Sequence, residues 1–200
     1  MNVTTTDATR GTSIDALHRQ ALESTHRFVA GIEAGQWTNP TPCADWNVRA
    51  LVNHVVAGNL WAVELASGRT IADVGNRLDG DQLGAVPLQA YDESAHAAAL
   101  VFEAPGALEA PCAVSYGPVP GSVYAGHRFI DVLIHGYDIA AATGQNPKLD
   151  PRLTDACWEV VEPQLAAFRA SGMFGTDPDG PLPTDPQHRL LAALGRPNHT

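Results

Sequence analysis

The sequence predicts an all-α protein, built as an antiparallel four-helix bundle with additional C-terminal helices. Apolar residues recur three and four positions apart along five long segments, as is typical of helices that pack on a core. No segment alternates apolar and polar residues over a useful length, so an extended sheet is not indicated. Short stretches rich in Pro and Gly separate the segments, and short connections favour antiparallel neighbours.

The first two predicted helices cover residues 14–32 and 48–67. Ser13, or the Thr before it, is suited to cap the first helix. The connection that follows contains two prolines, which interrupt regular structure until Asp45 or Asn47 can cap the second helix.

The third helix is predicted over residues 87–102, because Pro87 suits the first turn of a helix. Residues 69–85 contain several Gly and Asp and predict a loop that folds over one end of the bundle. The stretch 107–120 is rich in Pro and Gly and leaves room only for a short extended piece at residues 114–116.

The fourth predicted helix, residues 121–144, is mostly apolar or small and should therefore be buried on most sides. Gly144 suits the left-handed position that ends many helices. Asp150 is suited to cap a fifth helix over residues 151–170, and a last short helix covers residues 188–194.

These elements predict a single domain over residues 1–200. A metal-binding bundle occupies residues 13–144, and a C-terminal helical extension occupies residues 145–200. A chain of 200 residues and 21.1 kDa is long enough to bury one sizeable core. Residues 1–12 lack apolar periodicity and are expected to be loosely attached.

The composition narrows the class of partner. With 12 Lys and Arg against 22 Asp and Glu, the formal net charge is −10, which argues against nucleic-acid and anionic-membrane partners. The three cysteines are far apart and form no CxxC pair, so we expect neither disulfides nor a zinc ribbon, but a cytoplasmic protein. The N-terminal residues carry no signal-peptide pattern, and no apolar run is long enough to span a membrane. A mostly helical surface leaves a homodimer open.

Four ionisable residues share one side of the fourth predicted helix. His127, Asp131, His135 and Asp138 follow one another at spacings of four, four and three. Burying such groups without compensation costs several kcal/mol, so we expect them to be paired, hydrogen-bonded or bound to a metal. Two interpretations stand for Asp131 and His135: a hydrogen-bond network in the core, or two ligands of an ion that takes a third ligand from another helix.

His54 on the second helix is the candidate for that third ligand. Its apolar neighbours, taken alone, favour a core histidine. In four-helix bundles, however, inward-facing residues of different helices supply metal ligands. Two imidazoles and one carboxylate leave a coordination position open, as in catalytic zinc sites, and also describe the facial triad of iron oxygenases. In a third interpretation, the three residues never meet.

Two stretches, TPCADWNVRALVNHVVAGNLW and HRFIDVLIHGYDIAAATG, resemble the DinB-like metal-binding family, most of all the N-terminal domain of the mycothiol-dependent maleylpyruvate isomerases. The resemblance covers the four bundle helices. It implies that His54, Asp131 and His135 bind a divalent metal, with zinc first and nickel, iron or manganese as alternatives. Asp131 stands where the family has Glu, and residues 145–200 stand where the isomerase has a further domain that helps to bind substrate.

The same resemblance implies thiol chemistry, because a thiol coordinated to a metal is deprotonated at neutral pH. The predicted function is that of a metal-dependent transferase or isomerase that uses mycothiol or a similar low-molecular-weight thiol as cosubstrate. Its other partner would be a small-molecule electrophile. The alternative is a non-catalytic bundle protein that binds a metal or a small ligand.

The roles of several neighbouring residues stay open at this point. Asp138 is expected either to orient His135 through its second ring nitrogen or to serve as a cap or surface residue. Arg128 either neutralises a substrate carboxylate or pairs with Asp131. For His127, a packed or solvent-facing side chain is favoured over a fourth ligand. Four further residues are expected to pack as apolar side chains: Cys43, Cys112, Trp46 and Trp61.

Overall fold

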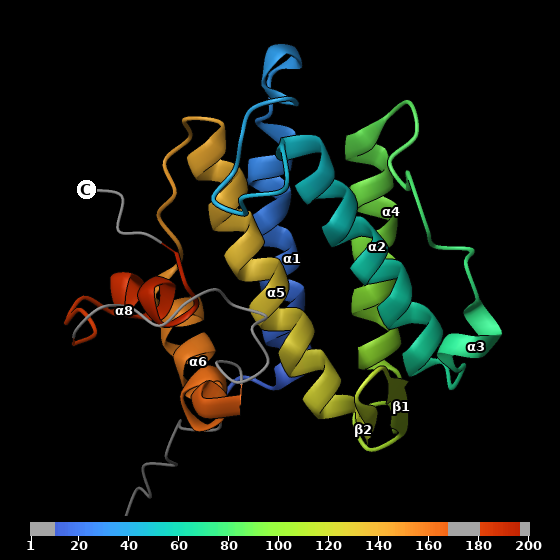
Figure 1. Ribbon diagram of the computed structural model, residues 1–200. Coiled ribbons are helices and arrows are strands. Elements are labelled where there is room, and N and C mark those ends of the chain that lie inside the picture. The colour runs from blue at the N-terminus through green and yellow to red at the C-terminus, as the bar shows by residue number, and fades with distance from the viewer. Residues whose placement is uncertain (1–10, 168–180, 197–200) are drawn as a thin grey trace, which may run out of the picture.

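The computed structural model describes residues 11–167 and 181–196, which are mostly helical (Figure 1). Four long helices form the bundle: α1 (Ile14–Ala30), α2 (Val48–Ala66), α4 (Pro87–Glu103) and α5 (Gly121–Ala142). Smaller elements lie in the connections: η1 (Ala34–Gln36), α3 (Ile71–Val74), β1 (Pro111–Val114) and β2 (Gly117–Pro120). Three further elements follow the bundle: α6 (Pro151–Val161), η2 (Glu162–Gln164) and α8 (Pro186–Ala193). The predicted all-α bundle with C-terminal helices is confirmed.

The ends of the bundle helices lie within two residues of the predicted bounds, and local chemistry explains most of them. The Asn47 side chain accepts a hydrogen bond from the Ala50 N–H at 2.9 Å and thereby caps α2. Pro87 occupies the first turn of α4, where its missing N–H has no intrahelical partner to lose. After α5, Gly144 adopts the predicted left-handed conformation with φ 68°. Ser13 precedes α1 as expected, but its side chain makes no capping hydrogen bond.

Helix α5 lies at the centre of the fold, with α1, α2 and α6 packed around it (Figure 1). A Cβ atom at Gly136 would lie 2.4 Å from Thr25 Oγ1, so only glycine allows α1 to approach α5 this closely. Thr25 Oγ1 donates a hydrogen bond to the Val132 carbonyl at 2.9 Å. Most residues of α5 are buried, as its apolar composition predicts. Among the described residues, no helix is both long and apolar enough to cross a membrane.

The connections before and after α4 hold structure that the sequence analysis did not predict. The extended piece expected at residues 114–116 is instead the end and turn of an antiparallel hairpin, in which β1 pairs with β2. The loop predicted over residues 69–85 contains α3, a single turn capped by Thr70, whose hydroxyl accepts a hydrogen bond from the Asp73 N–H at 3.2 Å. Both elements depend on hydrogen bonds between residues that are close together in the sequence. Such bonds need no apolar periodicity, so the sequence pattern does not reveal them.

The fifth predicted helix is shorter than expected. Helix α6 begins after Asp150, which caps it as predicted, but it ends at Val161. Pro163 has no backbone N–H to continue the helical hydrogen bonds, and the chain tightens there into the 3₁₀ turn η2. Residues 165–167 are helical again, and the remainder of the predicted helix, 168–170, lies outside the described residues.

Helix α8 begins two residues before the predicted start at His188. The Asp185 side chain accepts a hydrogen bond from the His188 N–H at 2.9 Å, and Pro186 occupies the first helical position. The helix gives way to a left-handed Gly195 with φ 73°, at the position where the sequence predicted its end. Arg196, which follows this glycine, lies close to α5.

Candidate metal centre

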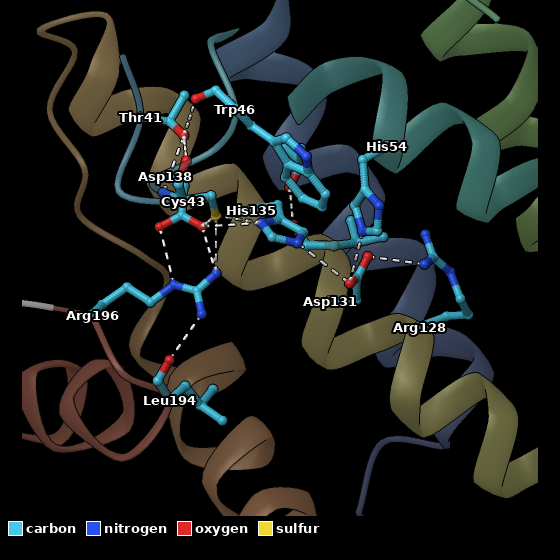
Figure 2. Close-up of polar contacts among 12 residues, drawn as sticks. Thr41, Cys43, Trp46, His54, Arg128, Asp131, His135, Asp138, Leu194 and Arg196 are labelled. Carbon is cyan, nitrogen blue, oxygen red and sulfur yellow. Dashed lines mark hydrogen bonds and ion pairs between the residues drawn. The ribbon is translucent and has the colours of Figure 1, made fainter. Parts of the chain in front are cut away.

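Two neighbouring helices bring the three predicted ligands together (Figure 2). His54 lies on α2, whereas Asp131 and His135 lie one turn apart on α5. His54 Nε2 is 3.3 Å from Asp131 Oδ1, and His135 Nε2 is 3.4 Å from the same oxygen. One ligand atom of each residue lies within 4.8 Å of those of the other two. The three side chains therefore meet, and their binding of a metal stays a prediction.

The spacing of these atoms suits a small divalent cation. Atoms bound at about 2.0–2.2 Å to one tetrahedral centre lie about 3.3–3.6 Å apart. Both distances to Asp131 Oδ1 fall in this range. Two imidazoles and one carboxylate fit zinc, and they fit nickel, iron and manganese as well. The residues present thus fit the group that the resemblance implies, without selecting one metal.

His54 is a pocket residue and not a core histidine, because 35% of its side chain is exposed. Its ring lies 4.5 Å from the Trp46 ring, centroid to centroid, at an interplanar angle of 32°. Its other ring neighbour is His135, at 5.0 Å and nearly perpendicular. Trp46 packs against the apolar core, as expected, and its ring also lies over a predicted ligand.

Asp131 uses its two oxygens differently. Oδ1 faces the two imidazoles, and Oδ2 accepts a hydrogen bond from Arg128 Nη1 at 2.9 Å (Figure 2). Burial alone would raise the pKa of Asp131, but the Arg128 guanidinium and the His135 imidazole hold this pKa well below its usual value. Of the two roles left open for Arg128, pairing with Asp131 is the one the structure contains.

His135 is held by a second carboxylate. Its Nδ1 lies 3.0 Å from Oδ2 of Asp138, which is fully buried. Because a carboxylate only accepts, Nδ1 donates the hydrogen, which leaves Nε2 to face Asp131. Burial alone would lower the pKa of His135, but Asp131 and Asp138 raise it well above its usual value. Asp138 therefore orients His135 and is not a surface residue.

Arg196, in the segment after α8, completes this chain of contacts. Its Nη2 donates to Asp138 Oδ2 at 2.8 Å, and its Nε donates to Oδ1 at 3.3 Å. Burial alone would raise the pKa of Asp138, but His135 and Arg196 lower it. The sequence analysis missed Arg196, because it lies in no periodic segment and its partner is far away in the chain.

Cys43 packs against the apolar core, as expected, and its thiol also makes polar contacts in this region. Its Sγ lies 3.4 Å from Asp138 Oδ2, 3.9 Å from His135 Nδ1 and 3.6 Å from Arg196 Nη2. Cys43, His135 and Asp138 therefore form a second group of ligand atoms within 4.8 Å of one another. The Arg196 guanidinium already contacts two members of this group. Cys112 is fully buried, as predicted.

A pocket of about 580 Å³ opens onto these side chains. Its lining comes from the connection before α2, from α2 and α5, and from the segment after α8: Pro42, Cys43, Ala44, Asp45, Trp46, His54, Asp131, His135, Gly195 and Arg196. The three predicted ligands thus face a space large enough for a small molecule.

His127 does not join the other polar residues of α5. Its Nδ1 is hydrogen-bonded to the Tyr116 hydroxyl, and its Nε2 lies 3.2 Å from Gln164 Oε1. It lies two turns from His135 and is absent from both groups of metal-competent residues that the described part of the chain contains. Trp61 packs beside an apolar cluster, as expected.

The sequence matches the model of the mycothiol maleylpyruvate isomerase N-terminal domain over residues 18–140, which is more than half of the chain. Two relatives come from Mycobacterium tuberculosis: Uncharacterized protein MT0763 of strain CDC 1551 / Oshkosh and Uncharacterized protein Rv0738 of strain ATCC 25618 / H37Rv. Each is 35% identical over 184 residues, which cover 90% of this chain and 95% of the relative.

Two crystal structures of the mycothiol-dependent maleylpyruvate isomerase, one of a mutant form, are similar to this fold. Their TM-scores are 0.58 and 0.55, at 14% identity, over 80% of this chain and 71% of theirs. At this identity the likeness concerns the fold alone. The match over residues 18–140 carries the assignment further, and the chain belongs to the family of the mycothiol maleylpyruvate isomerase N-terminal domain.

Proposed function

We propose that this protein is a metal-dependent transferase or isomerase that uses a low-molecular-weight thiol of the mycothiol type. The observation that carries the proposal is the meeting of His54, Asp131 and His135 at a pocket of about 580 Å³. A divalent metal bound by these residues would lower the pKa of a coordinated thiol, so that the thiolate is available at neutral pH. The isomerase of similar fold is mycothiol-dependent, which supports a thiol as cosubstrate.

The protein holds the predicted ligands in a defined arrangement. Asp138 fixes the orientation and tautomer of His135, and Arg128 occupies one oxygen of Asp131. The carboxylate behind His135 raises the basicity of this ligand, and both hydrogen bonds limit the rotation of the side chains that they hold. The ligand atoms therefore need little rearrangement to bind a cation.

The electrophile would enter the same pocket as the thiol. Pro42, Ala44 and Trp46 offer apolar surface along its lining, which suits a compact or planar electrophile. The thiol sulfur would form a bond to an electrophilic carbon of this molecule, and the thiol proton would be transferred to the product.

Metal content is the first test. Protein purified without a polyhistidine tag should contain one equivalent of a divalent metal by elemental analysis, and the His54→Ala variant should contain almost none. The matched control is His96→Ala, because His96 is an exposed histidine on α4. Equal metal content in the wild type and the His54→Ala variant would remove His54 from the site.

Thiol consumption is the second test. Metal-loaded protein is mixed with mycothiol and a panel of small electrophiles, and loss of free thiol is followed over time. Turnover by the wild type and by His96→Ala, but not by His54→Ala, would support the proposal. Metal binding without thiol consumption would instead favour the non-catalytic metal- or ligand-binding bundle. Oxygen uptake with Fe(II) and a 2-oxo acid would favour iron chemistry.

A further inference from the structure

Arg128 is a cation buried inside the bundle, with a residue exposure of only 7%. Its guanidinium donates hydrogen bonds to three groups. Nη1 donates to Asp131 Oδ2 at 2.9 Å, and Nη2 donates to Asn59 Oδ1 at 3.2 Å and to the Val55 carbonyl at 3.4 Å. The planar fork therefore joins α5 to α2 at the level of the predicted metal ligands.

Gly58 provides the space for this guanidinium. A Cβ atom at position 58 would lie 2.3 Å from Arg128 Nη1, 2.6 Å from Cζ and 2.7 Å from Nη2. Glycine inside a helix is unfavourable by about 1 kcal/mol relative to alanine, so its presence in the middle of α2 calls for a compensating reason. The close approach of the Arg128 guanidinium to the α2 backbone is that reason.

The Asn59 side chain is fixed in its turn. Its Nδ2 donates to Ser94 Oγ at 3.3 Å, and the Ser94 hydroxyl donates to the Tyr91 carbonyl of α4 at 2.9 Å. Asn59 therefore presents its oxygen to Arg128 in a defined direction. The guanidinium is thus held by direct contacts from α5 and α2, and α4 supports it through Asn59, which restricts its movement when the Asp131 carboxylate rotates.

A carboxylate binds a metal through one oxygen or through both, and the choice changes the number of ligands around the metal. Arg128 occupies Asp131 Oδ2, while Oδ1 alone faces His54 and His135. We infer that Arg128, seated against Gly58, is a positioning residue that makes Asp131 a one-oxygen ligand and thereby keeps the coordination number low. This inference rests on the proposed metal site. It concerns how that site selects its coordination geometry.

The test uses the full-length protein loaded with Co²⁺, whose visible absorption is stronger in four-coordinate than in five-coordinate sites. Arg128→Met should free Asp131 Oδ2 to join the metal, so that the molar absorption of bound cobalt falls. Gly58→Ala should displace the guanidinium and lower the absorption in the same way. In the double variant, Gly58→Ala should add nothing to the effect of Arg128→Met.

Two matched controls separate this role from general damage. Gly126→Ala changes a glycine of α5 whose added Cβ would meet its nearest atom at an ordinary 3.5 Å. Arg19→Met removes an arginine whose ion pair with Glu103 lies at the surface. Both controls should keep the absorption of the wild type. Arg128→Lys keeps the charge but not the fork, so it should resemble Arg128→Met and not restore the spectrum.

The outcomes distinguish the inference from the proposed function. If the wild type binds no cobalt, the metal site and the inference both fail. If the wild type binds cobalt and the spectrum is unchanged in Arg128→Met and in Gly58→Ala, only the inference is overturned. Should Arg128→Met not fold, judged by circular dichroism, Gly58→Ala and Arg128→Lys decide the question by the same absorption measurement.

Discussion

Asp138 and His135 form a buried hydrogen bond of 3.0 Å between Oδ2 and Nδ1, and this bond aims the opposite ring nitrogen at Asp131. Asp138 has no exposed surface, so it interacts only with other groups of the protein. His54 has no comparable carboxylate behind it among its described hydrogen bonds. The orientation of the His135 ring is therefore more restricted than that of the His54 ring.

Asp138→Asn should weaken metal binding about 10–100-fold, because such hydrogen bonds typically contribute this much to affinity. The amide keeps the size of the carboxylate but loses its charge. Competition with a chromophoric chelator measures the affinity. Asp92→Asn is the matched control, because Asp92 forms a similar 2.7 Å contact with His26 at the surface. Equal affinities in wild type and Asp138→Asn would show that His135 needs no orienting partner.

Acid should destabilise the folded protein through His18. This residue is fully buried, both of its ring nitrogens lack a hydrogen-bond partner, and burial, followed by Arg128, lowers its pKa to about 3. The unfolded chain keeps the ordinary value of 6.5 and binds the proton first, so stability is complete above pH 6.5 and falls between pH 6.5 and 3. The limiting slope is about 1.4 kcal/mol per pH unit.

His18→Leu should remove this slope, because leucine has no proton to gain. Urea unfolding of metal-free protein at several pH values, compared between wild type and variant, isolates the contribution of His18 from other titrating groups. His96→Leu is the control, because His96 is exposed. A wild type and a His18→Leu variant that lose stability in parallel as the pH falls would contradict the assignment.

Arg196→Met should destabilise the fold by about 3–5 kcal/mol, because it leaves the buried Asp138 carboxylate without its cation. The guanidinium contacts Asp138 at 2.8 Å, and the two side chains are 9% and 0% exposed. In Arg49→Met, the lost partner is Asp81 in an exposed pair, so the loss of stability should be much smaller. Urea unfolding of both variants checks the difference. Similar small losses would mean that Asp138 is satisfied without Arg196.

Gly136→Ala should destabilise the contact between α1 and α5 by about 1–3 kcal/mol, the usual result of overpacking. The added methyl would lie 2.4 Å from Thr25 Oγ1. Thermal unfolding gives the loss, and Thr25→Ala in the same chain should recover part of it by removing that oxygen. If Thr25→Ala brings no recovery, the close approach of the two helices is not the cause.

The elements that local chemistry determines were predictable from the sequence. Asn47, Pro87 and Asp150 each act within one helical turn of themselves, and they begin α2, α4 and α6 as expected. Asp131 and His135 were identified for the same reason, because a spacing of four places two side chains on one helix face. His54 was a different case, since its own helix favoured a core histidine, and only bundle geometry and the resemblance connected it with them.

Contacts between distant segments were not predictable in this way. Arg196 meets Asp138 only because α8 folds back on α6 beside α5. Cys43 and Trp46 reach the pocket from an irregular connection whose path depends on such contacts as the Thr41 hydroxyl donating to the Trp46 carbonyl at 2.8 Å. No spacing rule in the sequence records a path of this kind.

The position of Trp46 over His54 provides a built-in optical reporter. The chain has four tryptophans, and the ring of this one lies 4.5 Å from the imidazole at the pocket. Indole emission is quenched by a nearby open-shell metal such as Co²⁺ or Ni²⁺, so binding of such a metal at the pocket should register as a change in fluorescence without any attached dye. A Trp46→Phe variant should lose this change in fluorescence, which would assign the change to Trp46.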